Sequence, residues 1–272
     1  MENQPPKTER IEIRPMGSYF EVDTEGYVVN PASLENIQPE WKPLVDDIVE
    51  TYKAVYGEYL RQVYVRGSVA KGQAVRGVSD IDTFAYVDQS PEYVRENGIS
   101  DELQKALEEK YDFVQGIEMS VSSLDQVSDK RIILNQSVCV YGEPIEVTKL
   151  KPGKEMAIHA PALHKRMARF EGFLERGDIP DDEMKDRCVW FMKTFLRVGF
   201  ELTMDREHKY TRDLYPCYET FAKYYPEHEP EMRRALDLVL NPTADKQEMK
   251  KVVDTLGQWL VSEVPKYFEV RE

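Results

Sequence analysis

The feature that most constrains this chain is a pair of short apolar runs separated by a polar segment with three glycines, within residues 62–87. The first run, residues 63–65, is long enough for one buried strand, and Gly67-Ser68 ends it. The second run begins with the tripeptide Asp-Ile-Asp at residues 80–82. The pattern predicts a strand, a glycine-bearing loop and a second strand.

The two aspartates of the second run are two residues apart. Side chains at i and i+2 of a strand point to the same face, so we expect Asp80 and Asp82 to project side by side while Ile81 turns into the core. Two carboxylates this close repel each other unless a cation lies between them. Mg²⁺ typically binds one or two carboxylates together with substrate phosphates. The aspartate pair therefore predicts a magnesium site.

Gly67 and Ser68 supply a second element of the pattern. A glycine directly after a strand lets backbone N–H groups approach an anion closely, so this loop is a candidate phosphate-binding loop. Gly-Ser followed by Asp-x-Asp on a strand resembles the nucleotidyltransferase superfamily that includes DNA polymerase β. The sequences of residues 67–72 and 79–82 are most similar to those of its aminoglycoside adenylyltransferase branch.

A third carboxylate is predicted on a later strand. Ile117, Met119 and Val121 alternate with polar residues, which places Glu118 on the face opposite the core. In the resembled family a carboxylate stands on the strand beside Asp-x-Asp, and the resemblance implies that Glu118 is the general base and lies near the metal. Asp125 is the alternative, although it follows the expected end of the strand.

The second half of the chain is predicted to be helical, with apolar periodicity near 3.6 in residues 155–176 and 183–204. Lys193 and Arg197 are four residues apart and share a helix face, which on its own is typical of a solvated surface. The resemblance implies instead that basic side chains here contact the triphosphate. Arg212 stands where the family has the lysine of a Ser-Lys pair, and arginine keeps the charge.

These patterns give an α+β fold class. A nucleotidyltransferase core with a mixed sheet is expected in residues 1–152, followed by an all-α helical bundle in residues 153–272 that binds substrate or nucleotide. An N-terminal hairpin is expected in residues 17–30, without an assigned function, and a short strand at residues 11–14.

Composition limits the partners. The 272 residues contain 36 Lys and Arg against 50 Asp and Glu, a formal net charge of −14. This balance disfavours nonspecific nucleic-acid binding and suits a cationic partner, or serves solubility alone. The three cysteines are scattered, and no stretch approaches the ~20 apolar residues of a membrane span, so we expect a cytoplasmic protein without a membrane segment.

Together the resemblance implies a metal-dependent nucleotidyltransferase that uses two Mg²⁺ ions and ATP. It would move AMP to a hydroxyl of a small, cationic acceptor such as an aminoglycoside, which links the branch to antibiotic resistance. Two alternatives stay open: transfer to a protein side chain, and a non-catalytic nucleotide-sensing module on the same fold.

Overall fold

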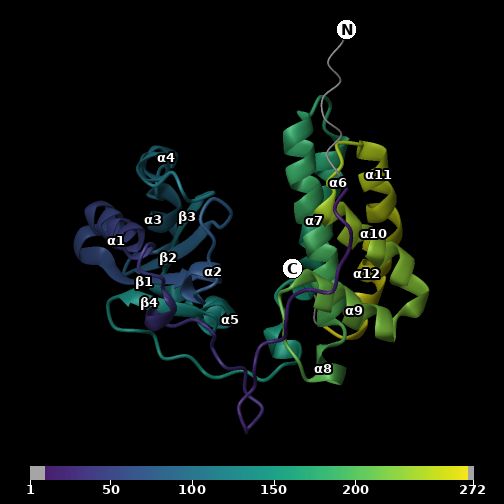
Figure 1. Ribbon diagram of the computed structural model, residues 1–272, viewed down its shortest axis with the longest axis horizontal. Coiled ribbons are helices and arrows are strands. Elements are labelled where there is room, and N and C mark those ends of the chain that lie inside the picture. Colours follow the sequence, from purple (N-terminus) through teal and green to yellow (C-terminus); the bar gives the residue numbers. More distant parts are fainter. Residues whose placement is uncertain (1–9, 269–272) are drawn as a thin grey trace. The chain divides into compact units, whose positions relative to one another are not determined.

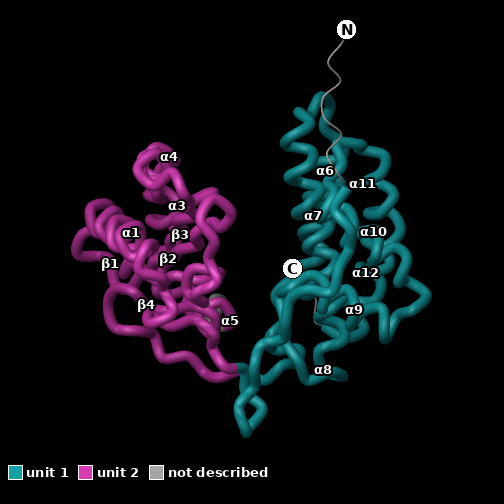
Figure 2. The backbone as a smooth tube through the Cα atoms, in the orientation of Figure 1, with its two compact units in different colours: residues 1–28, 151–272 teal, residues 29–150 magenta. Residues whose placement is uncertain are grey.

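The computed structural model describes the backbone of residues 10–268 and their side chains except those of residues 128–131. The chain forms two compact units (Figure 2). We call Val29–Leu150 the sheet unit, and Met1–Val28 with Lys151–Glu272 the helical unit. The ends of the expected domains, residues 1–9 and 269–272, lie outside the described residues.

The sheet unit is built on a four-stranded mixed sheet with the order β3-β2-β1-β4 (Figure 1). β1 is antiparallel to β2 and to β4, whereas β2 and β3 are parallel. The parallel pair is joined through two helices, as a parallel connection requires. In chain order the elements are α1 (Lys42–Tyr56), β1 (Leu60–Arg66), α2 (Gly67–Ala70), β2 (Ile81–Val87), α3 (Pro91–Glu96), α4 (Asp101–Lys110), β3 (Ile117–Ser123), α5 (Arg131–Leu134) and β4 (Ser137–Tyr141).

Helix α1 covers one face of the sheet with the apolar stripe that its 3.6-residue period predicts. Leu44, Ile48 and Tyr52 are fully buried. The hydroxyl of Tyr52 donates to the backbone oxygen of Ser120 on β3 at 3.0 Å and lies 3.2 Å from Oγ1 of Thr83 on β2. One buried side chain of α1 thus fixes the two parallel strands against each other.

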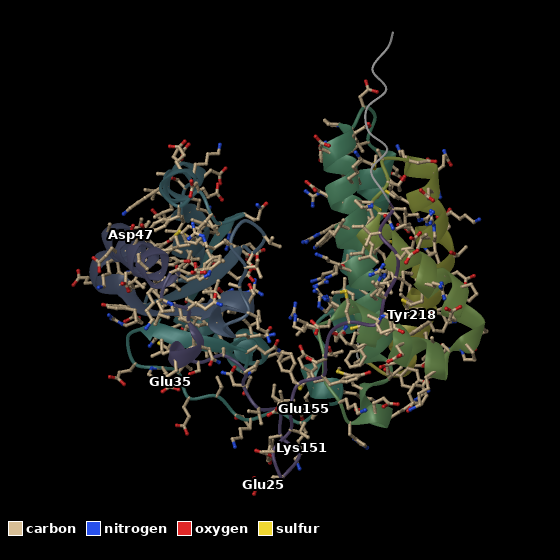
Figure 3. All side chains as sticks on the ribbon, in the orientation of Figure 1. Glu25, Glu35, Asp47, Lys151, Glu155 and Tyr218 are labelled. Carbon is tan, nitrogen blue, oxygen red and sulfur yellow. The ribbon has the colours of Figure 1, made fainter. Side chains whose placement is uncertain are left out.

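Helix α4 is joined to α1 through Asp47, labelled in Figure 3. Lys110 donates to this carboxylate, and so does the Tyr111 hydroxyl at 2.7 Å. These bonds, the lysine first, lower the pKa of Asp47. Ser100 caps the start of α4 by accepting from the N–H of Leu103 at 3.4 Å. The strand β3 that follows α4 is thereby anchored at its entry.

The other sheet face carries an aromatic cluster. Tyr64, Phe84 and Tyr86 are buried there, and the rings of Tyr64 and Phe84 stack at 5.1 Å between centroids. The Tyr64 hydroxyl accepts from the N–H of Ile145, at 2.7 Å, in the segment after β4. Both faces of the sheet are therefore covered, so exposed functional side chains are expected at the ends of its strands.

The helical unit packs around α7, whose Phe191 stacks on Phe170 of α6 at 4.0 Å between ring centroids. A π-helical turn, Val253–Gly257, joins the two last α-helices. Among the described residues, no helix has the length and apolar character needed to cross a membrane. The helices are α6 (Leu163–Glu175), α7 (Asp181–Glu201), α8 (Met204–Glu207), α9 (Leu214–Tyr224), α10 (Glu229–Leu240), α11 (Lys246–Val252) and α12 (Gln258–Glu263).

The N-terminal segment, residues 10–28, groups with the helical unit, whereas the sequence led us to place it with the sheet. The expected hairpin is reduced to one isolated bridge between Val22 and Val28, and residues 11–14 form no strand. The reason lies in its hydrogen bonds. Ile11 exchanges two 2.8 Å bonds with the Asn241 side chain, and Phe20 N–H donates to Tyr210 O at 2.8 Å. Backbone groups satisfied in this way have no need of a sheet edge.

Candidate active site

The loop of the candidate site begins where β1 ends at Arg66. Gly67 has φ +76°, a left-handed conformation that glycine adopts without strain, and it starts the one-turn helix α2. A Cβ atom at this position would lie 2.9 Å from Oδ2 of Asp82. The N–H of Gln73 closes the loop by donating to the Ser68 oxygen at 2.9 Å. Gly67 is therefore required for two reasons: its backbone conformation is left-handed, and the Asp82 carboxylate approaches it closely.

The carboxylates lie at the start of the two parallel strands. β2 begins at Ile81, so Asp80 is the last residue of the preceding loop and is exposed, while Ile81 is buried as expected. The parallel register places Asp82 directly opposite Glu118 on β3. Thr83 Oγ1 donates to the Glu118 backbone oxygen at 2.9 Å and so holds this register. The structure thus sets the second aspartate of the pair beside the predicted third carboxylate.

Arg66 is a residue of this site that the sequence analysis missed. It pairs with Asp82 in the antiparallel register of β1 and β2. Its Nη2 donates to Asp82 Oδ1 at 3.0 Å and to Glu118 Oε1 at 3.4 Å. The sequence offered one signal, the position of Arg66 directly before Gly67. The last residue of a strand lies beside the first residues of its antiparallel neighbour, and here these include Asp82.

The alternative third carboxylate, Asp125, lies elsewhere. It follows the end of β3, and its N–H donates to Ser123 Oγ at 3.2 Å. Ser123 is paired with Val87, at the opposite end of β2 from Asp82. Glu118 and Ser123 are five positions apart on the strand, a span of about 16 Å. Of the two candidates, Glu118 is the one beside the aspartate motif.

Three predicted basic residues gather in the helical unit. Lys193 and Arg197 from α7 and Arg212 from the loop before α9 line one cavity of about 440 Å³. Arg14 of the N-terminal segment and Tyr215 of α9 also line it. Helical spacing explains the first pair, but the addition of Arg212 and Arg14 depends on the tertiary fold.

Arg197 is largely enclosed in this cavity. Burial, and then the charge of Arg212, lower the pKa of its guanidinium to about 10. Its Nε is shut off from solvent and has no hydrogen-bond partner among the described residues. A buried donor without a partner is unfavourable, and an anionic ligand would relieve both the charge repulsion and the missing bond. The cavity is therefore suited to an anion.

Comparison with known families bears on the sheet unit. Residues 46–139, from α1 into β4, match the family model described as "Nucleotidyltransferase domain". The sheet unit carries a nucleotidyltransferase domain. The expectations of a nucleotidyltransferase domain, of an enzyme of this type and of an α+β core followed by a helical region are confirmed.

The chain is similar to the crystal structure of spectinomycin adenyltransferase AAD(9) from Enterococcus faecialis with ATP and spectinomycin, at 13% identity and a TM-score of 0.44. That similarity covers 82% of this chain and 99% of the other. No curated protein matches the chain.

The carboxylates of the nucleotidyltransferase domain bear on whether it can bind a divalent metal ion. Among the described residues, no three His, Cys, Asp or Glu side chains form a ready metal-binding group. Asp82 Oδ1 accepts from Arg66, but the missing Cβ of Gly67 leaves room at Asp82 Oδ2, and Asp80, two residues earlier, is exposed. Two carboxylate ligands suit Mg²⁺ when phosphate oxygens and water complete the shell. The residues fit a site that is completed by substrate.

The N-terminal segment also holds the loop that carries Arg212. Ser18 N–H donates to Asp213 Oδ2 at 2.8 Å, and Thr211 Oγ1 donates to the Ser18 oxygen at 2.7 Å. Gly17 has φ +92° and lies so close that a Cβ would come within 2.5 Å of the Asp213 side chain. Sequence reasoning assigned this segment no role, because only long-range contacts reveal one.

A buried carboxylate supports the same end of the helical unit. Glu201, near the end of α7, accepts N–H bonds from Ile158, His159 and Ala160 at 2.6–3.1 Å. Burial raises the pKa of Glu201 to about 7 despite these bonds. Burial, and then the charge of Arg166, hold the pKa of His159 well below its usual range. His159 Nδ1 can therefore accept from Arg166 Nη1, 2.6 Å away.

Proposed function

We propose that this chain is a metal-dependent nucleotidyltransferase that moves AMP from ATP to a hydroxyl of a small, cationic acceptor. The observation that carries the proposal is the meeting of Gly67, Asp82 and Glu118 at adjoining strand ends of a nucleotidyltransferase domain. A glycine-bearing loop beside paired carboxylates supplies both a place for phosphate and a place for a divalent cation.

The proposed reaction is an in-line displacement at the α-phosphorus of ATP. The acceptor oxygen forms a bond to this phosphorus, the bond to the bridging oxygen of the β-phosphate breaks, and pyrophosphate leaves. Glu118 takes the proton of the acceptor hydroxyl. Gly67 and Ser68 hold phosphate oxygens, and Asp80 and Asp82 would hold Mg²⁺, with Glu118 close to it. When bound, Mg²⁺ neutralises charge on the transferred and departing phosphates.

The helical unit contributes cationic contacts to the phosphates in this proposal. Lys193, Arg197 and Arg212 are the residues, and their shared cavity supports the assignment. Arginine forks match phosphate oxygens well, so Arg212 and Arg197 are the stronger contacts.

The acceptor is proposed from charge. A chain with a net charge of −14 and an exposed glutamate at the reacting group favours a polycationic acceptor such as an aminoglycoside over a nucleic acid. The first compounds to test are spectinomycin, which is present in the AAD(9) structure, and other aminocyclitol or aminoglycoside antibiotics. If the wild type modifies none of them but releases pyrophosphate with a protein hydroxyl, the acceptor class is wrong and the transfer chemistry stands.

The decisive experiment compares Asp80→Asn and Asp82→Asn with the wild type. We expect pyrophosphate release to fall by about 10²–10³-fold, the scale on which lost transition-state charge stabilisation acts, with circular dichroism unchanged. Asp88→Asn is the control, because Asp88 lies at the other end of β2 and pairs with Arg61. Calorimetry with MgATP gives the second readout. Unchanged Mg²⁺-dependent ATP binding in both active-site variants would falsify the metal assignment.

A further inference from the structure

Three charged side chains stand in one row across three neighbouring strands. Arg66 on β1 is paired with Asp82 on β2, which is paired in turn with Glu118 on β3. The Nη2 atom of Arg66 lies 3.0 Å from Asp82 Oδ1 and 3.4 and 3.5 Å from the two Glu118 oxygens. A single cationic nitrogen therefore serves both carboxylates.

This nitrogen lies between Asp82 and Glu118, two carboxylates that would otherwise share a metal ion. Two-metal sites place their ions about 3.5–4 Å apart, bridged by carboxylates that would otherwise repel each other. Asp82 is the bridging candidate, since Asp80 lies before it in the chain and Glu118 beside it in the sheet. The cation between Asp82 and Glu118 in this structure is Arg66.

Two facts distinguish this contact from an ordinary surface ion pair, which contributes little to the stability of a fold. The Arg66 and Asp82 side chains are only 27% and 22% exposed, and the guanidinium is shared by two carboxylates. Arg66 also belongs to an inner strand of the sheet and is followed by Gly67, whose φ +76° fixes the turn. Strand register thus sets the backbone position of Arg66, and the two carboxylates hold its guanidinium.

We propose that Arg66 is a tethered cation that takes the place of one of two divalent ions, so that the site binds a single ion at Asp80 and Asp82. The inference rests on the proposed function, since it concerns the same carboxylates, and it replaces the two ions that the family resemblance implies. With one divalent ion, the three carboxylates and Arg66 sum to zero formal charge. With two ions they would sum to +2.

The test counts bound Mn²⁺ by electron paramagnetic resonance, with Mn²⁺ as the probe and α,β-methylene-ATP as a nucleotide that cannot be cleaved at the α-phosphorus. We expect one tightly bound ion per wild-type chain and two per Arg66→Met chain. Without nucleotide, removal of the competing guanidinium should lower the Mn²⁺ dissociation constant about tenfold, because solvent screens a partly exposed charge to about this level. Arg66→Lys keeps the charge and should still bind one ion.

Arg61→Met is the matched control. Arg61 lies on the same strand and pairs with Asp88 at 2.6 Å, at the opposite end of the β1–β2 pair. Its Mn²⁺ count and affinity should equal those of the wild type, and thermal unfolding of every variant verifies the fold.

The possible results separate this inference from the proposed function. Two ions in the wild type, or an unchanged count and affinity in Arg66→Met, overturn the role of Arg66 and leave nucleotidyl transfer standing. No bound Mn²⁺ in the wild type and Arg66→Met overturns the metal assignment itself and the Arg66 role with it. One ion in the wild type and two in Arg66→Met support both.

Discussion

The sheet unit and the helical unit handle charge in opposite ways. The sheet unit presents its carboxylates at strand ends, where Asp80 and Glu118 are exposed and Asp82 is half-buried. The helical unit encloses one of its cavity cations, Arg197, whose Nε is buried without a partner among the described residues. An exposed carboxylate is stable without a ligand, because water solvates it. An enclosed guanidinium gains more from an anion, since the cavity has already removed its water.

The difference teaches which unit should govern each step. A carboxylate that remains hydrated carries little desolvation free energy. It can exchange a metal ion or a proton readily, which suits the chemical step. Charges that are already desolvated bind a complementary anion without further desolvation, which suits substrate affinity. Changes in the sheet unit should therefore lower the rate, and changes in the cavity of the helical unit should lower nucleotide affinity.

The largest expected effect is on the rate, through Glu118. Glu118→Gln keeps the size of the side chain but cannot take a proton from the acceptor. Turnover should fall by about 10²–10⁴-fold, the contribution of a general base, while ATP still binds. Measuring ATP affinity and turnover in the same variant gives the answer.

Two outcomes would change the role of Glu118. Loss of both properties would make Glu118 a metal ligand first. Loss of neither would remove it from the site, and Asp125→Asn, otherwise the inert control, would then become the variant to examine.

The next largest expected effect is on ATP affinity, through the basic residues of the cavity in the helical unit. Arg212→Ala should weaken ATP binding by about 1.5–3 kcal/mol, the scale of a charge-assisted hydrogen bond. Arg197→Ala should follow the same direction. Isothermal titration calorimetry measures both. Arg187→Ala is the control, because Arg187 lies on the same helix, is exposed and does not line the cavity. Wild-type affinity in Arg212→Ala would exclude it from the nucleotide site.

The same comparison explains what the sequence could predict. Gly67, Asp82 and Glu118, three of the residues that meet in the sheet unit, were named from strand alternation and one loop. Arg66 was missed because its role depends on strand register, which a single strand does not reveal.

In the helical unit, spacing along one helix identified Lys193 and Arg197 as neighbours. Family resemblance, and not spacing, named Arg212. The contribution of the N-terminal segment was hidden, because it depends on hydrogen bonds nearly two hundred residues apart in the chain, such as Ser18 to Asp213. Long-range contacts of this kind leave no periodic signal.

Stability should also depend on pH through the helical unit. The pKa of Glu201 is raised from 4.5 to about 7 by burial, so the folded chain keeps a proton that the unfolded chain releases between these values. This contribution is fully present below pH 4.5 and is lost as the pH rises through 7. The full shift corresponds to at most about 3 kcal/mol.

Glu201→Gln isolates this effect, because the amide oxygen still accepts backbone N–H bonds and never ionises. Urea unfolding at pH 5 and pH 8 should show the wild type losing stability relative to the variant as the pH rises. His159 and Arg166 are present in both proteins, so their own titration cancels in the difference. Parallel pH profiles would show that Glu201 is charged throughout.

The smallest expected effect tests the contact between loop and carboxylate in the sheet unit, and two glycines make it separable. Gly67 and Gly77 have nearly the same backbone conformation, with φ +76° and +74°. Alanine at either position should lower the free energy of unfolding by about 1–2 kcal/mol, because a left-handed conformation is unfavourable for an L-residue. Only at Gly67 would the new Cβ press on Asp82, 2.9 Å from Oδ2, whereas at Gly77 it meets no described atom within 4 Å. Gly67→Ala should therefore also weaken Mn²⁺ binding severalfold by displacing that carboxylate, and Gly77→Ala should leave it unchanged. If the two variants lose equal stability and bind Mn²⁺ equally well, the close approach of Gly67 to Asp82 has no part in shaping the metal site, and the loop serves the phosphates alone.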